Sequence, residues 1–334
     1  MNLSDSRFLQ LQQWLACQFA VPITVSLISG DASFRRYFRV MVGTQSYIVA
    51  DSPPEKLDNQ PFLALADAYL QAQIPVPEII AVDVTQGFIL QQDLGDQQLL
   101  SLLNIDNVSD WYRQALALLP QIAKVTSSQA GPLPLYDAAF VQRELAIFPE
   151  WLLQQHWQLS LTGDEQQLLQ QVFALLTENV LAQPRVGMHR DFHSRNLMVR
   201  QQRLYVIDFQ DAVQGPLTYD AVSLLRDCYI RWPDSVVDKL RDGFYQQCQQ
   251  QQLLDSQVSV AQFNRWFDLM GLQRHLKAAG IFARLLHRDG KSGYIKDIPL
   301  TLEYVADISE RYPELKDFGD WVRQRLLPLC GENC

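Results

Sequence analysis

The feature that most constrains the fold is a change in the pattern of apolar residues near residue 95. Before it, short runs rich in β-branched and aromatic residues alternate with Gly and Pro. After it, long stretches place apolar residues at steps of three and four, which indicates helices. We therefore predict an α+β protein with two lobes: a small antiparallel sheet in residues 1–93 and a larger, mostly helical part in residues 94–334.

The first part should begin with a helix. Apolar residues recur at helical spacing between Arg7 and Phe19, and Pro22 follows. The other elements predicted here are three strands, a helix and a hairpin, at 25–29, 37–42, 46–50, 61–73 and 78–92.

The second part should consist mainly of long helices. They are predicted at 109–127, 138–155, 164–182, 236–253, 260–287 and 298–326. Between the third and the fourth lies a β-like hairpin, with arms at 188–199 and 204–212. Because this hairpin carries polar groups inside a helical part, we expect the chemistry there.

Charge and composition exclude several classes of partner. The chain has 28 Lys and Arg against 37 Asp and Glu, a net charge of −9, which suits neither nucleic-acid phosphates nor anionic lipid. No apolar run is long enough for a membrane helix and the start lacks a signal peptide, so we expect a cytoplasmic protein without an obligate protein partner. Scattered cysteines favour reduced thiols; Cys330 and Cys334 alone are close enough to bridge or hold a metal.

One segment carries a specific catalytic pattern. Residues 189–196 match H-R-D-x-x-x-x-N, and Asp208 follows the next predicted strand, as in phosphoryl transfer of the kinase type. Asp191 would orient an acceptor hydroxyl and take its proton, while Asn196 and Asp208 would hold Mg²⁺ against the phosphates of ATP. His189 would have a structural role, with a hydrogen bond to backbone near Asp208.

Two other interpretations of this segment are less favoured. His189, Asp191 and His193 form an H-x-D-x-H pattern that would suit a metal-dependent hydrolase, but no further His or Cys has supportive spacing. Alternatively, the two Asp residues cap turns and Asn196 is a loop residue. The motifs of serine hydrolases and P-loop enzymes are absent from the sequence.

The nucleotide should contact two places in the first part. The segment 30–37 joins two predicted strands, where backbone N–H groups, a hydroxyl and arginines can meet phosphates. The segment 91–94 lies where the sheet gives way to helices and can read an adenine edge. The predicted nucleotide contacts are Gly30, Ser33, Arg35, Arg36, Gln92, Asp93 and Leu94.

Taken together, these segments resemble the aminoglycoside phosphotransferase and choline kinase family, which has the protein-kinase-like fold. The resemblance runs from about residue 30 to 313 and is most specific over 188–227. Within the family, the segments 30–40, 188–199 and 206–233 are similar to bacterial anomeric kinases for N-acetylmuramate and N-acetylglucosamine, which act in cell-wall recycling. The resemblance implies a structural role for Asp220 beneath the catalytic loop.

The sequence departs from the kinase pattern in the first part. The strand 46–50 lacks the usual lysine, and helix 61–73 lacks a Glu to pair with it. Arg35, Arg36 or Lys56 are the candidates to supply that positive charge. Only about nine residues separate Asp208-Phe209-Gln210 from Tyr219-Asp220, a span too short to dock a protein substrate, which favours a small-molecule acceptor.

The acceptor contacts are predicted from their position after the catalytic elements. The candidates are His193, Gln210, Asp211, Arg226 and Arg231. Arg226 or Arg231 would bind the carboxylate of N-acetylmuramate, although Arg226 and Asp227 are equally well explained as a pair on a helix surface. A kinase for choline, homoserine or an aminoglycoside is the alternative, and the missing lysine also leaves a non-catalytic nucleotide-binding protein open.

Overall fold

The computed structural model describes residues 6–29 and 35–333, and its backbone forms two compact units. The first unit contains Met1–Leu102, Ser127–Pro132 and Arg195–Gln210, and the second contains the rest of the chain. The predicted lobes, 1–93 and 94–334, are continuous segments. The first unit instead also takes in two later segments, for reasons given below.

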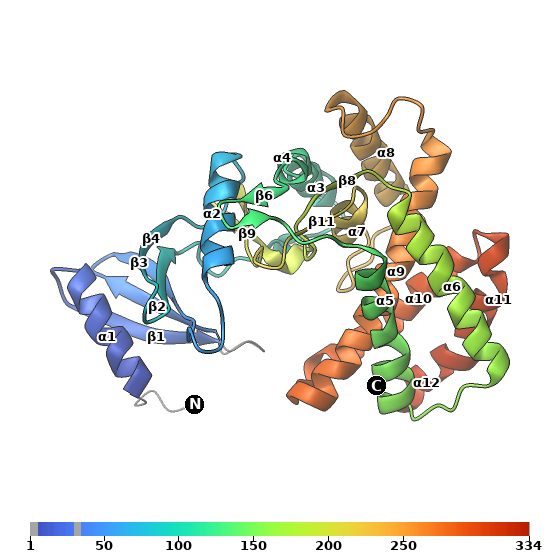
Figure 1. The fold of residues 1–334 in the computed structure, drawn as a ribbon, viewed down its shortest axis with the longest axis horizontal. Coiled ribbons are helices and arrows are strands. Elements are labelled where there is room, and N and C mark those ends of the chain that lie inside the picture. Colours follow the sequence, from blue (N-terminus) through green and yellow to red (C-terminus); the bar gives the residue numbers. More distant parts are fainter. Residues whose placement is uncertain (1–5, 30–34, 334) are drawn as a thin grey trace. The chain divides into compact units, whose positions relative to one another are not determined.

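The first unit is built on an antiparallel sheet with one helix at its start (Figure 1). The helix α1 spans Ser6–Gln18 and the sheet has the strand order β1-β2-β3-β5-β4. Its strands are β1 (Ile23–Ser29), β2 (Arg36–Val42), β3 (Gln45–Asp51), β4 (Ile79–Asp83) and β5 (Phe88–Gln92). The predicted first helix, three strands and hairpin are therefore confirmed.

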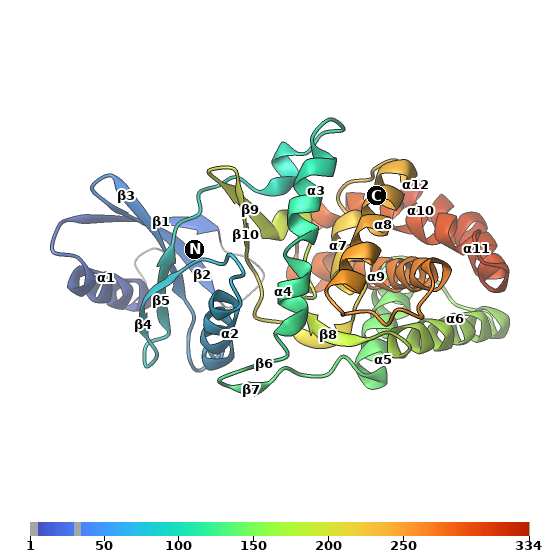
Figure 2. The same cartoon turned by 90° about the horizontal axis from the view of Figure 1, so that it is seen from above.

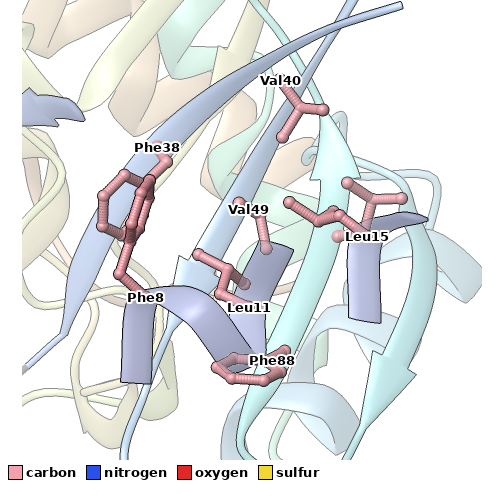
Figure 3. Packing of buried hydrophobic residues seen from close by; sticks show 8 residues of the cluster. Phe8, Leu11, Leu15, Phe38, Val40, Val49 and Phe88 are labelled. Atoms are coloured by element: carbon pink, nitrogen blue, oxygen red, sulfur yellow. The ribbon is translucent and has the colours of Figure 1, made fainter. Parts of the chain in front are cut away.

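One face of α1 covers this sheet, as Figure 3 shows. Phe8, Leu11 and Leu15 follow each other at three- and four-residue steps and are all buried. They pack on buried strand residues, and the rings of Phe8 and Phe38 lie 5.2 Å apart. The cluster also contains Val40, Val49, Phe88 and Leu90.

Two short hairpins join the first unit although they come later in the chain. In the first, β6 (Ser127–Ser128) pairs with β7 (Gly131–Pro132), and β6 packs against helix α2 (Gln60–Gln71). In the second, β9 (Leu197–Arg200) pairs with β10 (Arg203–Val206), so the predicted hairpin is present but is much shorter than its predicted arms, 188–199 and 204–212.

Backbone hydrogen bonds attach the second hairpin to this unit. The amide of Val206 donates to the carbonyl of Pro75 at 2.7 Å, and the amide of Val199 donates to that of Gln97 at 2.8 Å. The turn residues Gln201 and Gln202 have φ of 50° and 61°, the left-handed pair that a tight two-residue hairpin needs. Because these bonds join segments far apart in the sequence, a boundary near residue 93, predicted from the local residue pattern, does not enclose the whole unit.

The second unit is mostly helical and is organised around one long helix, α9 (Val260–Asp289). Figure 2 shows α9 in the middle of this unit, and it packs against the π-helical segment η2 (Phe148–His156) and five helices. Those helices are α5 (Ala138–Ile147), α6 (Gly163–Leu181), α7 (Tyr219–Leu225), α8 (Asp234–Gln250) and α10 (Ile298–Ser309). The predicted helices at 164–182, 236–253 and 260–287 are confirmed.

Proline breaks or reshapes the other predicted helices. The helix predicted at 109–127 is α3 (Val108–Leu116) and α4 (Leu119–Lys124), with Pro120 in the first turn of the second helix. The helix predicted at 138–155 becomes π-helical at Phe148-Pro149. The helix predicted at 298–326 ends at Ser309, and the chain continues through η5 (Pro313–Leu315), α11 (Lys316–Trp321), η6 (Val322–Leu326) and α12 (Leu327–Asn333).

A strand pair that the sequence analysis missed holds the start of the catalytic segment. Here β8 (Arg185–Met188) pairs with β11 (Val213–Pro216), two four-residue strands that carry little periodicity. A Cβ on Gly187 would lie 2.2 Å from the carbonyl oxygen of Val125, so only glycine allows β8 to pass this close to α4. Among the described helices, none is both long and apolar enough to cross a membrane.

Candidate active site

The segment with the catalytic pattern leaves β8 as a loop that is fixed from below by Asp220. The carboxylate of Asp220, in the first turn of α7, accepts the amide of His189 at 2.7 Å and that of Arg190 at 2.9 Å. These bonds hold Arg190 at φ 80°, in the left-handed region that a non-glycine residue rarely occupies. Asp220 thus lies where the family resemblance implied.

His189 is fully buried and acts within the loop. Its Nδ1 accepts the amide of Asp191 at 3.2 Å, and its ring lies edge-on to Phe192 with centroids 5.8 Å apart. This backbone bond is to Asp191, the candidate catalytic residue itself. This contact orients the backbone from which the Asp191 side chain projects.

Asp227 fixes the other end of the loop. Its carboxylate accepts the amide of Ser194 at 3.0 Å and a very short bond from the Ser194 hydroxyl. The second carboxylate oxygen accepts the amide of Tyr229 at 3.1 Å. Asp227 is only 1% exposed, so the interpretation of this residue as part of a pair on a helix surface is wrong.

A buried ionic network surrounds the base of Asp191. The Glu144 carboxylate pairs with the Lys277 ammonium at 2.9 Å and with the Arg190 guanidinium at 2.8 Å. Lys277 also donates to the Tyr219 hydroxyl at 3.1 Å, and Glu144 accepts the hydroxyl of Tyr136. Helices α5 and α9 supply the two central charges, which come from positions 133 residues apart in the sequence.

The network favours the ionised form of Asp191. Burial by itself raises the pKa of a carboxyl group, but the positive charge of Lys277, followed by those of His193 and Arg190, outweighs it and lowers the pKa of Asp191. Lys277 and Arg190 also lower the pKa of Glu144 against the effect of its burial. A carboxylate that remains ionised near neutral pH is what a residue needs in order to accept a proton from an acceptor hydroxyl.

In the first unit, Asn196 and Asp208 lie side by side. The Asn196 side chain donates to Asp208 Oδ2 at 3.2 Å, and the amide of Ile207 donates to the Asn196 carbonyl at 3.0 Å. Asp208 has φ of 66° directly after β10, and its side chain is exposed. Gln210, which we predicted as an acceptor contact, donates to Asp208 Oδ1 at 2.6 Å.

This pair fits a Mg²⁺ site completed by phosphate oxygens. Mg²⁺ in kinases is held by one or two protein oxygen ligands together with water and substrate phosphates, and Asp208 and Asn196 offer such oxygens from adjacent positions. Among the described residues, no three His, Cys, Asp or Glu side chains are grouped as a metal site would require. The structure therefore gives no support to the interpretation of His189, Asp191 and His193 as a hydrolase metal cluster.

Phe209 ties the metal pair to helix α2. Its buried ring stacks on Phe62 with centroids 5.2 Å apart and an interplanar angle of 7°, and it also contacts Tyr69. The helix that lacks the usual glutamate is thus held against the Asp208 segment by aromatic packing.

Of the residues predicted to contact the nucleotide, Gly30 and Ser33 lie outside the described residues. The two predicted arginines, Arg35 and Arg36, have different surroundings. The Arg35 side chain is buried, donates to Ser52 and Asn59 at 3.3 Å, and lies over the Phe62 ring at 5.0 Å. Arg36 pairs with the fully buried Asp51 at 2.5 Å.

The predicted hinge residues are held by a second ionic group. Asp93 pairs with Arg39 at 2.7 Å, and Arg39 also pairs with Asp96 at 2.8 Å. The amide of Gly95 donates to Asp93 at 2.8 Å, and the carboxylate is nearly buried. The side chain of Asp93 therefore holds the chain where β5 ends, while Gln92 is still paired within the sheet and Leu94 is buried.

The predicted acceptor residues separate into two groups. The His193 ring lies edge-on to Tyr229 with centroids 5.5 Å apart, and Asp211 is exposed. By contrast, Arg226 is 3% exposed and pairs with Asp268 at 2.6 Å, and Arg231 pairs with Asp307 at 2.5 Å. This pairing argues against the predicted role of either arginine as the carboxylate contact.

Sequence reasoning missed Glu144 and Lys277 as parts of the site. Glu144 and Lys277 lie in helical segments whose apolar spacing gives no sign that one charge on each is buried. The sequence of α9 mixes polar and charged residues with apolar ones, and only the structure shows that most of this helix, Lys277 included, is buried.

Comparison with known proteins gives a consistent result. The model of the phosphotransferase enzyme family matches residues 24–251. The chain is 38% identical over 331 residues to the N-acetylmuramate/N-acetylglucosamine kinase of Pseudomonas putida, covering 96% of this chain and 97% of that protein. It is 39% identical over 327 residues to the protein of the same name from Pseudomonas aeruginosa, covering 95% and 96%.

Solved structures agree in fold at low sequence identity. ADP-bound aminoglycoside phosphotransferase APH(2'')-Ib has a TM-score of 0.61 at 13% identity, with 90% of this chain and 98% of that chain covered. Choline kinase LicA from Streptococcus pneumoniae has a TM-score of 0.63 at 12% identity, with 90% and 100% covered. The predicted protein-kinase-like fold and the family resemblance are confirmed.

Proposed function

Because the chain belongs to the phosphotransferase enzyme family, we propose that it is a kinase that transfers the γ-phosphoryl group of ATP to the C1 hydroxyl of N-acetylmuramate and N-acetylglucosamine. The observation that carries this proposal is sequence identity of 38–39% over nearly the full length to two kinases with those acceptors in their names. We also propose that the protein acts in the cytoplasm and that its binding partner is a small-molecule substrate.

The residues of the loop supply the steps at the acceptor. Asp191, ionised because of Lys277 and Arg190, would accept a hydrogen bond from the C1 hydroxyl and take its proton as the phosphoryl group is transferred. Asp220 and Asp227 hold the loop at both ends, so the Asp191 carboxylate keeps one orientation.

Asn196 and Asp208 would hold Mg²⁺, which when bound neutralises phosphate charge and orients the γ-phosphoryl group. Gln210 would orient the Asp208 carboxylate through its hydrogen bond to Oδ1. Phosphoryl transfer depends mainly on such positioning and charge stabilisation, and the chain provides both from rigid elements.

The same proposal assigns the missing strand lysine to Arg35. Its guanidinium lies on the face of Phe62, and Phe62 stacks on Phe209, the neighbour of Asp208. These ring contacts connect the Arg35 guanidinium to the segment that carries Asp208, which supports its role as the cation for the nucleotide phosphates. Arg35→Gln should raise the KM for ATP by about tenfold or more with little change in the KM for the sugar. Equal effects on both KM values would contradict this role.

The proposed function is tested by measuring ADP release with ATP and Mg²⁺ on a panel of acceptors. The panel contains N-acetylglucosamine, N-acetylmuramate, choline, homoserine and an aminoglycoside, with phosphorus NMR to locate the phosphate. Turnover of the two amino sugars to their 1-phosphates, lost in Asp191→Asn, is the expected result. Turnover of choline or homoserine instead, or equal activity in Asp191→Asn, would refute the proposal.

A further inference from the structure

One surface of α9 has a half-buried cation, Arg284, that the catalytic network leaves unused. Residues Ala278, Ile281, Arg284 and Leu285 recur at steps of one to four and are half-buried, whereas the helix before them is almost entirely buried. Arg284 lies seven residues, or two turns, after Lys277 and therefore on the same side of the helix, about 10 Å along its axis. Lys277 is the cation that acts most strongly on Asp191.

Arg284 differs from Arg226, Arg231 and Arg288, which form ion pairs, and it is less buried than Arg274, whose Nε and Nη1 also have no acceptor. Within residues 6–29 and 35–333, Arg284 forms no hydrogen bond or ion pair, and its Nε is buried without an acceptor. Burial and the positive charge of Arg288 lower the pKa of Arg284, against the opposing effect of the Asp289 and Glu150 carboxylates. A partly buried guanidinium in a positive field is stabilised by an incoming anion.

An aromatic strip borders this surface on another side of α9. It begins at His193 in the catalytic loop and continues through Tyr229 to Phe282, with centroids 5.5 Å and then 6.0 Å apart. Phe282 in turn stacks on Tyr294, 5.9 Å away. Sugar rings pack their apolar faces on such aromatic surfaces, so a sugar held here would have a wall beside the catalytic loop.

The two acceptors differ by one charged group. N-acetylmuramate is N-acetylglucosamine with a lactyl ether, so it carries a carboxylate that the other sugar lacks. Arg226 and Arg231 already pair with Asp268 and Asp307. We propose that Arg284 binds the carboxylate of N-acetylmuramate and thereby sets the preference between the two sugars, an inference that rests on the proposed function.

The test compares kcat/KM for the two sugars in the wild type, Arg284→Gln and Arg288→Gln. Arg288 is the matched control because it lies one turn further along α9 but pairs with Asp289 at 2.8 Å. In Arg284→Gln, the ratio of kcat/KM for N-acetylmuramate over N-acetylglucosamine should fall by about 10- to 100-fold, since a hydrogen bond to a charged group is lost. Arg288→Gln should leave this ratio within about twofold of wild type, and Arg284→Lys should recover part of it.

A measurement on the unaltered protein keeps the proposal testable if a variant does not fold. The amide of N-acetylmuramate lacks the negative charge, and the wild type should turn it over about 10- to 100-fold less efficiently than the acid. An unchanged ratio in folded Arg284→Gln, or equal use of amide and acid by the wild type, would overturn the role of Arg284 while leaving the kinase assignment intact. A wild type inactive on both sugars would instead overturn the proposed function and, with it, this inference.

Discussion

Replacing Lys277 by Met removes one charge of the buried network while keeping the length of the side chain. Lys277 and Glu144 are both less than a tenth exposed and their charged atoms lie 2.9 Å apart. At an effective dielectric constant of about 20, the attraction between unit charges at this distance is about 6 kcal/mol, and the desolvation of both groups opposes it.

The expected loss in the free energy of unfolding is about 3 kcal/mol. Removing one partner of a buried pair costs about 3–5 kcal/mol, and the lower end applies because Glu144 keeps Arg190 at 2.8 Å. The matched control is Arg265→Met, which removes a pair of similar length to Glu314 at 2.7 Å but at a half-exposed position. That control should cost less than about 1 kcal/mol.

Urea unfolding at pH 7 measures both variants through the midpoint and the slope. The double variant Glu144→Gln, Lys277→Met should be more stable than the sum of the single effects predicts, by about 1 kcal/mol or more, because neither charge is then left alone. If Lys277→Met costs no more than Arg265→Met, or the two single effects simply add, the buried network does not have the energetic role argued above.

Asp220→Asn should change how stability depends on pH. Burial raises the pKa of Asp220 to about 7 from 3.8, so between these values the folded protein holds a proton that the unfolded chain releases. The wild-type free energy of unfolding should therefore lose up to about 4 kcal/mol from this group as pH rises from 4 to 7, and urea unfolding of Asp220→Asn should lack that fall. Gly280→Ala should destabilise the protein, because the new Cβ in α9 would lie 2.5 Å from the Ile147 carbonyl oxygen. Gly243→Ala, with open space on α8, should instead raise the free energy of unfolding by about 1 kcal/mol. Thermal unfolding should therefore show a lower melting temperature for the first variant and a higher one for the second. Gln210→Leu should weaken the affinity for Mg²⁺ by about 10- to 100-fold, measured by titrating the reaction rate with magnesium. An unchanged magnesium concentration at half-maximal rate would show that the contact of Gln210 with Asp208 does not support metal binding.

Local patterns in the sequence determine much of this protein. The period of apolar residues predicts α1, α6 and α8 because each helix buries one face, and it also predicts α9, which the fold buries on most sides. The alternation in the first part predicts its strands. The pattern at 189–196 with Asp208 predicts the candidate catalytic residues, since kinase chemistry needs these side chains at short, fixed intervals. Proline positions also explain, in retrospect, where two predicted helices break and where a third becomes π-helical.

Tertiary structure decides the contacts that join residues far apart in sequence. Nothing near Glu144 indicates that Lys277 neutralises it, because the pair exists only once α5 and α9 pack together. The same holds for Arg226 and Arg231, which sequence alone offered as carboxylate contacts and which the fold pairs with Asp268 and Asp307. Charge type and spacing are local properties that a sequence displays, whereas the partner of a charge, and so whether it remains available to a substrate, depends on which helices the fold brings together.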